Sequence, residues 1–234
     1  MEIYSERAVK SAVISALFCA LFASGVFAHE IQGSILLEPP YPEIKPVKVE
    51  KKVKDSCADV RLPEGLIFNE NGGVQNVIVW LEGDFKKEYA GDFAPPVLDQ
   101  KGCRFDPHIV IIPAGRNFKI VNDDPVAHDI RGFDGVKMLF RFEMGAGDAP
   151  LFGKFDKPGI YLLRCGFHTW MHAIAVSAPH AYYAVSDALG KFILKDVPEG
   201  TYKLHLWHET LGEAQAGIDI RGPVENFSYT FKKH

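Results

Sequence analysis

Short runs of alternating apolar and polar residues recur along the chain, and Gly or Pro interrupts them throughout. This period of two is typical of β-strands that bury one face, whereas no long stretch beyond the first 28 residues sustains helical periodicity. We therefore predict an all-β sandwich fold. In residues 134–154, Gly, Asp and Met follow no regular order, and we predict a loop there, with or without a short helix. The clearest predicted strands are residues 32–37, 76–82, 108–112, 191–194 and 201–207.

The first 28 residues contain an apolar run, residues 12–23, which is followed by Val26, Phe27 and Ala28. This order is typical of a secretory signal peptide, so we predict cleavage after Ala28 and a periplasmic mature protein. An uncleaved membrane anchor is the alternative, although the run is short for a membrane span. No later apolar run is long enough to cross a membrane, and we expect no span in the mature chain.

The formal net charge of the chain is −4, and the signal segment carries two acidic and two basic residues that cancel. The mature protein is therefore mildly acidic. This charge gives no reason to expect binding to nucleic acid.

The residues with the clearest chemical signal lie between Cys165 and Met171, with His168 between them. Copper(I) favours soft sulfur ligands and copper(II) favours nitrogen, so two His, one Cys and a weak axial Met suit both oxidation states. A loop of this length can bring three of these side chains onto one ion, and the fourth must come from elsewhere. His128 is the best candidate, because it follows an Asn-Asp-Asp-Pro turn at the end of a predicted strand.

With these residues in this order, residues 97–178 resemble the cupredoxins, the small blue copper proteins. Among them the amicyanin-like group has the same CxxHxxM spacing. The resemblance also includes the segments that begin with Phe105-Asp-Pro, Pro113-Ala-Gly and Phe155-Asp-Lys-Pro-Gly. It implies a Greek-key β-sandwich that holds one mononuclear type 1 copper.

Carried over to this sequence, the resemblance implies that His128, Cys165 and His168 are the equatorial copper ligands and that Met171 is the axial ligand. The residue after His128 is Asp129, where many cupredoxins have an Asn that ties the two ligand loops together. The hydrogen bonding behind the ligands is therefore left open by the sequence.

The resemblance implies a one-electron carrier and not an enzyme, with a redox partner such as a cytochrome or a dehydrogenase. In this function, an exposed edge of His168, ringed by Phe167 and Trp170, passes electrons to the partner. The alternative function is copper storage or delivery, in which the metal is cargo. A trinuclear copper enzyme is not expected, because the sequence contains no HxH pair of the kind that multicopper oxidases repeat.

Two other interpretations of the ligand residues compete with copper. A free Cys is often a small buried apolar side chain. Structural zinc prefers four Cys or His ligands, and the HxxxH spacing of this chain, from His168 to His172, overlaps the copper loop. We expect His172 to turn outward. We expect His205 and His208 to pack rather than to bind a second metal, with His208 and Glu209 as a hydrogen-bonded pair.

The cysteine count favours one free thiol. Removing residues 1–28 leaves Cys57, Cys103 and Cys165, which is an odd number for an oxidising compartment. We predict a disulfide between Cys57 and Cys103, which leaves Cys165 to bind copper.

The C-terminal segment, residues 185–204, contains a turn, a strand, a Pro-Glu-Gly turn and another strand. It resembles the carboxypeptidase-regulatory or transthyretin-like β-sandwich, of which Gly33 and Gly73 begin possible counterpart strands. Residues 29–96 either pair with this sandwich around an inserted copper domain or belong to consecutive domains. The predicted domains are a signal peptide (1–28), an N-terminal β segment (29–96), a cupredoxin domain (97–178) and a carboxypeptidase-regulatory-like domain (179–234).

Overall fold

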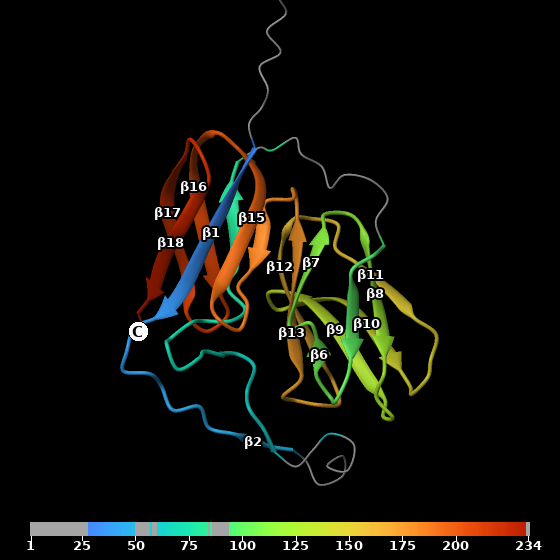
Figure 1. Ribbon diagram of the computed structural model, residues 1–234. Coiled ribbons are helices and arrows are strands. Elements are labelled where there is room, and N and C mark those ends of the chain that lie inside the picture. Colours follow the sequence, from blue (N-terminus) through green and yellow to red (C-terminus); the bar gives the residue numbers. More distant parts are fainter. Residues whose placement is uncertain (1–27, 50–56, 58–59, 84, 86–93, 233–234) are drawn as a thin grey trace, which may run out of the picture.

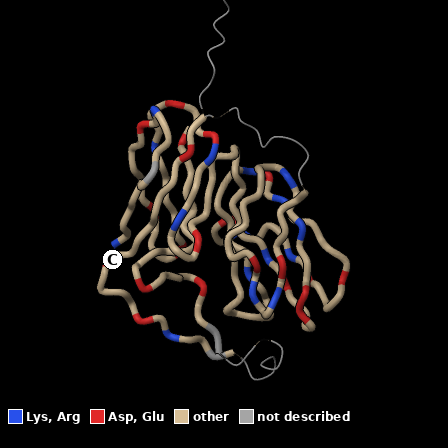
Figure 2. Tube along the Cα trace, in the orientation of Figure 1, with Lys and Arg blue, Asp and Glu red and all other residues tan. Residues whose placement is uncertain are grey.

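The computed structural model describes residues 28–49, 57, 60–83, 85 and 94–232. Within these residues the protein consists of β-strands in two sandwiches that lie side by side (Figure 1). The predicted all-β sandwich fold is confirmed. Acidic and basic residues occur on both sandwiches, with neither sign confined to one of them (Figure 2).

The first sandwich combines strands from both ends of the described chain. One sheet has the order β15-β1-β18, in which β1 is antiparallel to β15 and parallel to β18. The facing sheet has the order β14-β4-β16-β17 with antiparallel neighbours. The strands are β1 (Ala28–Leu37), β4 (Ile78–Glu82), β14 (Tyr183–Val185), β15 (Lys191–Pro198), β16 (Gly200–His208), β17 (Gly212–Ile220) and β18 (Val224–Phe231).

Alternation along β1 and β16 builds the core of this sandwich. In β1, Ile31, Ile35 and Leu37 point inward and are buried, and in β16 the same is true of Leu204 and Leu206. Burying such a side chain fully contributes about 1.5 to 3 kcal/mol relative to leaving it exposed. The alternation that predicted these strands therefore also fixes which face of each strand lies inside.

The second sandwich contains the middle of the chain. Its larger sheet has the order β10-β9-β12-β13-β7 and its smaller sheet the order β11-β8-β5-β6. The pairs β13-β7 and β5-β8 are parallel, and the other pairs are antiparallel. The strands are β5 (Val97–Gln100), β6 (Phe105–Asp106), β7 (Ile109–Pro113), β8 (Asn117–Asn122), β9 (His128–Asp134), β10 (Lys137–Met144), β11 (Leu151–Lys154), β12 (Gly159–Cys165) and β13 (His172–Ala178).

The predicted loop at residues 134–154 is wrong. Gly135, at a φ of 56°, turns the chain between β9 and β10, and β11 follows on the other sheet. The inner face of β10 carries Phe140, Phe142 and Met144, but Met138 is exposed on the same strand. Because apolar residues occur on both faces of β10, the alternation that marks a half-buried strand is obscured in the sequence.

A separate apolar cluster joins the two sandwiches. It lies between the sheet that contains β4 and β16 and the sheet that contains β7, β12 and β13. Each sandwich thus has one sheet that buries apolar side chains on both faces. The buried members of this interface are Ile78, Ile109, Ile174, Val176 and Ala178, and Trp80, Ile111, Ile160, Leu162, Tyr183, Val185 and Trp207 pack against them.

The strands from residues 29–96 have two kinds of pairing partner. β1 and β4 pair with C-terminal strands, whereas β2 (Val47–Lys48) and β3 (Val60–Arg61) pair with each other. The exact domain boundaries stay a prediction. Residues 1–27 of the predicted signal peptide lie outside the described residues, and Ala28 is the first residue of β1. No helix in the described part of the chain is long and apolar enough to cross a membrane.

We predict that the interface between the sandwiches contributes measurably to stability. Ile78 is fully buried in it, so Ile78→Val removes one methylene group and should lower the free energy of unfolding by about 0.5 to 1.5 kcal/mol. Ile193→Val in β15 is the matched control, because Ile193 is 46% exposed and the change should stay within about 0.5 kcal/mol. Urea unfolding of both variants measures the difference, and equal effects would contradict a packed interface.

Candidate metal centre

Strand pairing brings two of the predicted ligands together. β9 begins at His128 and β12 ends at Cys165, and the two strands are antiparallel neighbours with Cys165 opposite Ile130. In adjacent antiparallel strands, the start of one strand lies beside the end of the other. His128 and Cys165 are therefore close in the fold although they are far apart in the sequence.

A tight turn after β12 adds His168. The amide of Met171 donates to the carbonyl of His168 over 2.9 Å, and the amide of Cys165 donates to the carbonyl of Met171 over 3.0 Å. These bonds fold the chain back before β13 begins at His172. The turn therefore places the His168 ring beside Cys165.

The three side chains converge through the atoms that bind metals. Nδ1 of His128 lies 3.0 Å from Nδ1 of His168, and Sγ of Cys165 lies 3.7 Å and 3.5 Å from these two atoms. Atoms that share one ion, with metal–nitrogen distances of about 2.0 Å and metal–sulfur distances of about 2.3 Å, lie roughly 3.3 to 3.8 Å apart. The sulfur–nitrogen distances fit this range, and the two nitrogens need to separate only slightly.

The site is shielded from water. His128 is fully buried, His168 is 3% exposed and Cys165 is 5% exposed. Cys165 is the free cysteine of the described residues, since Cys57 and Cys103 form a disulfide with a Cα–Cα distance of 5.2 Å. The predicted pairing of the cysteines therefore agrees with the structure, and the thiol at the site remains available.

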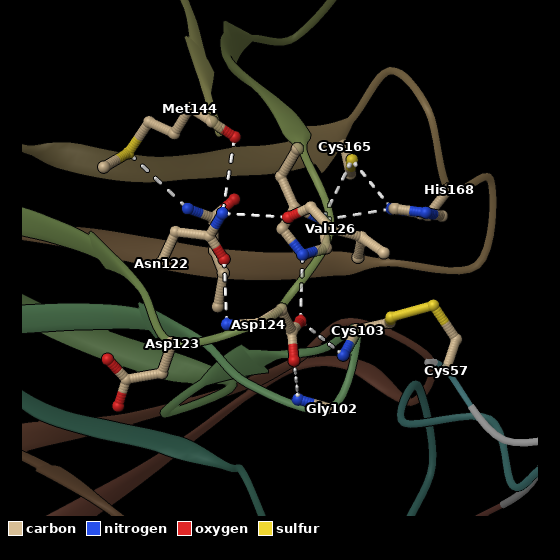
Figure 3. A network of polar contacts seen from close by, with 12 residues as sticks. Cys57, Gly102, Cys103, Asn122, Asp123, Asp124, Val126, Met144, Cys165 and His168 are labelled. Carbon is tan, nitrogen blue, oxygen red and sulfur yellow. Dashed lines mark hydrogen bonds and ion pairs between the residues drawn. A yellow bond between two sulfur atoms is a disulfide. The ribbon is translucent and has the colours of Figure 1, made fainter. Parts of the chain in front are cut away.

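Asp124 fixes the orientation of the His128 ring (Figure 3). Its Oδ2 lies 2.9 Å from Nε2 of His128, and its carboxylate also accepts hydrogen bonds from the amides of Gly102 and Cys103, over 2.5 Å and 2.7 Å. Because a carboxylate only accepts, the imidazole proton is on Nε2 and the lone pair of Nδ1 points toward Cys165. The carboxylate thus selects the tautomer that a metal requires.

Asn122 holds the turn that carries Asp124. Its side-chain amide donates to the carbonyls of Val126, Met144 and Gly145, over 3.0 Å, 3.3 Å and 3.0 Å, and its Oδ1 accepts the amide of Asp124 over 3.1 Å. These contacts join the turn to the end of β10 (Figure 3). The position of Asp124 is therefore set by a closed network of hydrogen bonds.

Burial lowers the pKa of His128, and the hydrogen bond to Asp124 opposes this shift without cancelling it. The neutral imidazole is therefore the stable form at neutral pH. Only the neutral ring has a lone pair for a metal.

Asp129 does not use its side chain to join the ligand loops. Its amide lies 3.5 Å from Sγ of Cys165, and its carbonyl accepts the amide of Gly166 over 2.7 Å. The loops are thus joined by the backbone. A Cβ on Gly166 would collide with the carboxylate of Asp129 and the guanidinium of Arg131, so a larger residue there would displace this ion pair.

The Asp129 carboxylate is fully buried and is paired with two arginines. It accepts from Nε and Nη2 of Arg131 over 3.0 Å and 2.5 Å, and from Nε of Arg141 over 2.8 Å. Burial alone would raise the pKa of Asp129, but the bonds from both arginines more than offset it and hold the pKa below its usual range. This ion-pair cluster joins the start of β9 to β10 through Arg141.

Met171 lies in the core of the same sandwich. It is 1% exposed and belongs to the apolar cluster that also contains Cys165. Its backbone closes the ligand turn, as described above. Its role as the axial ligand stays a prediction.

The expected exposed edge of His168 is wrong. The His168 side chain is 3% exposed, and Trp170 covers its ring, with ring centroids 5.2 Å apart. The disulfide also lies beside the ring, since the sulfurs of Cys57 and Cys103 are each within 4.8 Å of a His168 ring nitrogen. Trp170 is held in place because its Nε1 donates to the carbonyl of Cys103 over 3.2 Å. Phe167, by contrast, is 43% exposed. The tryptophan and the disulfide therefore form a cover between His168 and solvent.

Sequence reasoning missed the residues that support the ligands. Asp124 and Asn122 were seen only as a turn signal, and Arg141 lies in a segment that was predicted as a loop. The turn that places Asp124 four residues before His128 was in the sequence, but the contact between their side chains is visible only in the structure. The expectation that His172 turns outward is wrong, because its Nε2 lies 2.9 Å from Oε2 of Glu209. The expected pair of His208 and Glu209 is also wrong, since Nδ1 of His208 accepts from the amides of Thr210 and Leu211 and Glu209 is paired with His108 and His172.

No protein-family model matches this chain, and no curated protein sequence matches it. Among solved structures, it is similar to a purple cupredoxin from Nitrosopumilus maritimus, with 24% identity over 36% of this chain and 99% of the other and a TM-score of 0.32. A Cu-containing nitrite reductase from Thermus scotoductus matches at 27% identity over 38% of this chain, but over only 23% of its own length, with a TM-score of 0.33. A variant of amicyanin in the reduced state matches at 17% identity over 43% of this chain and 98% of the other, with a TM-score of 0.34.

We predict that Asp129→Asn destabilises the protein without disturbing the sulfur and nitrogen ligands. The change leaves Arg131 and Arg141 without their buried anion, which should lower the free energy of unfolding by about 1 to 2 kcal/mol, since both arginines reach solvent. Asp134→Asn on the same strand is the control, because Asp134 is exposed and the change should stay within about 0.5 kcal/mol. Urea unfolding tests this, and an Asp129→Asn variant as stable as the control would contradict it.

Proposed function

We propose that this protein is a periplasmic type 1 copper protein that acts as a one-electron carrier and not as an enzyme. The observation that supports it most directly is the convergence of Cys165 Sγ with the Nδ1 atoms of His128 and His168, at 3.0 to 3.7 Å. One thiolate and two imidazoles are the equatorial set of blue copper sites. When bound, copper supplies the one-electron couple.

The surrounding residues suit an electron carrier because they hold the ligands rigidly. Asp124 fixes the His128 ring, the backbone of Asp129 donates toward Cys165, and the turn bonds of Met171 fix His168. Ligands that cannot rearrange keep the same geometry in both oxidation states, which keeps the cost of changing the charge small. Because His128, Cys165 and His168 are buried, the surrounding residues also keep water away from the metal position.

Met171 is proposed as the weak axial ligand that completes the set. It is buried beside Cys165 within the same apolar cluster. A thioether in this position tunes the reduction potential rather than determining whether metal binds. A softer ligand favours the reduced ion.

The partner is proposed to be another redox protein, such as a cytochrome or a dehydrogenase, that docks over Trp170 and the exposed Phe167. The Trp170 ring touches the His168 ring and lies half-buried, so it connects the ligand to the surface. Aromatic side chains at a mixed surface suit brief docking without a strong charge requirement.

Copper storage or delivery is the second candidate function. The accessibility of the metal site distinguishes it from electron transfer. A delivery protein must release its metal, whereas His128 is completely buried and His168 is covered by Trp170 and the disulfide. This cover favours retention of the metal and therefore the carrier.

The visible and EPR spectra of the copper(II)-loaded protein test the proposal. A thiolate bonded to copper(II) gives an intense visible charge-transfer band and narrow copper hyperfine splitting, and Cys165→Ser should abolish both while the protein remains folded. Met171→Leu should shift the reduction potential and leave the band in place, and Met138→Leu, at a residue that is 52% exposed, should change neither.

A pale copper(II) spectrum in the unmodified protein would contradict a type 1 site. A typical spectrum together with rapid transfer of the metal to an acceptor apoprotein, and without a reversible couple, would favour storage or delivery instead.

We further predict that Asp124→Asn accelerates copper loss. The amide cannot accept from the amides of Gly102 and Cys103 and from His128 as the carboxylate does, so the ring loses its fixed tautomer. Removal of such a supporting partner typically weakens metal binding by about 10- to 100-fold. Transfer of copper to a chelator measures the rate. Asp123→Asn is the control, because Asp123 is exposed and next to it in the same turn, and equal rates in the two variants would contradict the role of Asp124.

A further inference from the structure

A second convergent group of ligand-type side chains lies where the two sandwiches meet. It consists of His108, just before β7, His172, the first residue of β13, and Glu209, just after β16. His108 and His172 belong to the second sandwich and Glu209 to the first. One nitrogen or oxygen atom of each lies within 4.8 Å of the others.

Both histidines direct the same atom at one carboxylate. Nε2 of His108 lies 2.5 Å from Oε1 of Glu209, and Nε2 of His172 lies 2.9 Å from Oε2. The two rings meet edge to face, with centroids 5.0 Å apart. Two imidazoles and one carboxylate that converge in this way are a ligand set for a divalent transition-metal ion.

The hydrogen bonding of His172 prepares its Nε2 for a metal. Nδ1 of this ring lies 3.3 Å from the carbonyl of Trp170, which can only accept, so Nδ1 carries a proton. In the absence of metal, Nε2 carries the proton that it shares with Glu209. A metal ion that displaces this proton meets a neutral ring whose Nε2 lone pair faces the carboxylate. A backbone carbonyl behind a metal-binding histidine is the usual arrangement that orients the ring.

The position is negatively charged and mostly buried. The side chains of His108, His172 and Glu209 are 6%, 25% and 18% exposed. Burial alone would raise the pKa of Glu209, but the hydrogen bonds from His108 and His172 outweigh it and hold the pKa well below its usual range, so the carboxylate is ionised. Glu64 adds a second negative charge near His172, and it is itself paired with Arg104 over 3.8 Å. The Glu209 carboxylate therefore supplies the negative charge that a bound cation needs at this position.

An open cavity gives access to the cluster. Its volume is about 490 Å³, and His172 and Glu209 are part of its lining, together with Arg164, Thr169, Trp207 and Tyr161. Three protein ligands leave at least one coordination position of a four-coordinate ion for water or a small anion. The cavity provides room for that ligand.

We propose that His108, His172 and Glu209 form a second metal site, distinct from the site of Cys165, which binds a divalent transition-metal ion such as Zn²⁺ and joins the two sandwiches. The ion takes the place of the protons that the two Nε2 atoms otherwise share with the carboxylate. Its ligands come from both sandwiches, so binding stabilises their contact.

The test uses the full chain with Cys165→Ser, which removes the thiolate of the first site. Titration with Zn²⁺ against a chelator should show one bound ion, and X-ray absorption at the zinc edge should show two imidazoles and no sulfur. The midpoint temperature of thermal unfolding should rise by about 5 to 10 °C when the concentration of free Zn²⁺ exceeds the Kd about 100-fold. Glu209→Gln and, separately, His108→Gln in this chain should weaken Zn²⁺ binding at least about tenfold.

The matched control is Glu82→Gln, because Glu82 pairs with a single histidine, His205, over 2.6 Å and should leave Zn²⁺ binding unchanged. The zinc-dependent shift in unfolding temperature is compared within each variant, so a change in basal stability does not affect the result. The proposal is overturned if no Zn²⁺ binds, which would make the cluster an ion pair only, or if Glu209→Gln and His108→Gln bind Zn²⁺ as well as the control. These outcomes do not depend on the copper spectrum of Cys165.

Discussion

The pairing of β9 with β12 is the interaction on which the candidate metal centre depends. It puts the first residue of one strand, His128, beside the last residue of the other, Cys165, in a register fixed by the antiparallel ladder. A slip of one residue would turn every side chain of the strand to the other face. The apolar residues between the two layers prevent such a slip, since Ile130 and Leu163 are completely buried. The packing of the core therefore determines the geometry of the ligands.

Buried carboxylates complete this arrangement, and each one has its partners. Asp124 accepts from two backbone amides and a ring nitrogen, and Asp129 accepts from two guanidinium groups. A buried charge without such partners costs several kcal/mol, so these residues specify one arrangement of the surrounding loops. Asp124 links the ligand turn to Cys103 and hence to the disulfide, whereas Asp129 links β9 to β10. The supporting contacts thus extend well beyond the ligands themselves.

The alternation of apolar and polar residues was sufficient to predict the fold class and five of the strands, because it is a local signal. The grouping of His128 with Cys165 and His168 was instead implied by the resemblance to the cupredoxins, since His128 and Cys165 are 37 residues apart. It did not predict β10, because Met138 and Leu139 expose apolar surface and hide the period of two. The cover over His168 could not be foreseen, since Cys57 and Trp170 meet only through the fold. The same holds for Glu209, whose partners His108 and His172 come from the other sandwich. Contacts between distant segments depend on how the sheets pack, and no short pattern encodes them.

The central position of β1 between β15 and β18 has a consequence for the order in which the chain folds. All strands from β5 to β13 are consecutive, so that sandwich can form as soon as residue 178 has been made. The other sandwich needs residues 28–37 to meet residues 191–231, and closing so long a loop is entropically more costly and slower. The early folding of the inserted sandwich brings the two ends nearer and reduces that cost. Until β15 arrives, however, both edges of β1 have unpaired backbone groups, and one edge stays unpaired until β18 arrives. This is the period in which the chain is most exposed to aggregation.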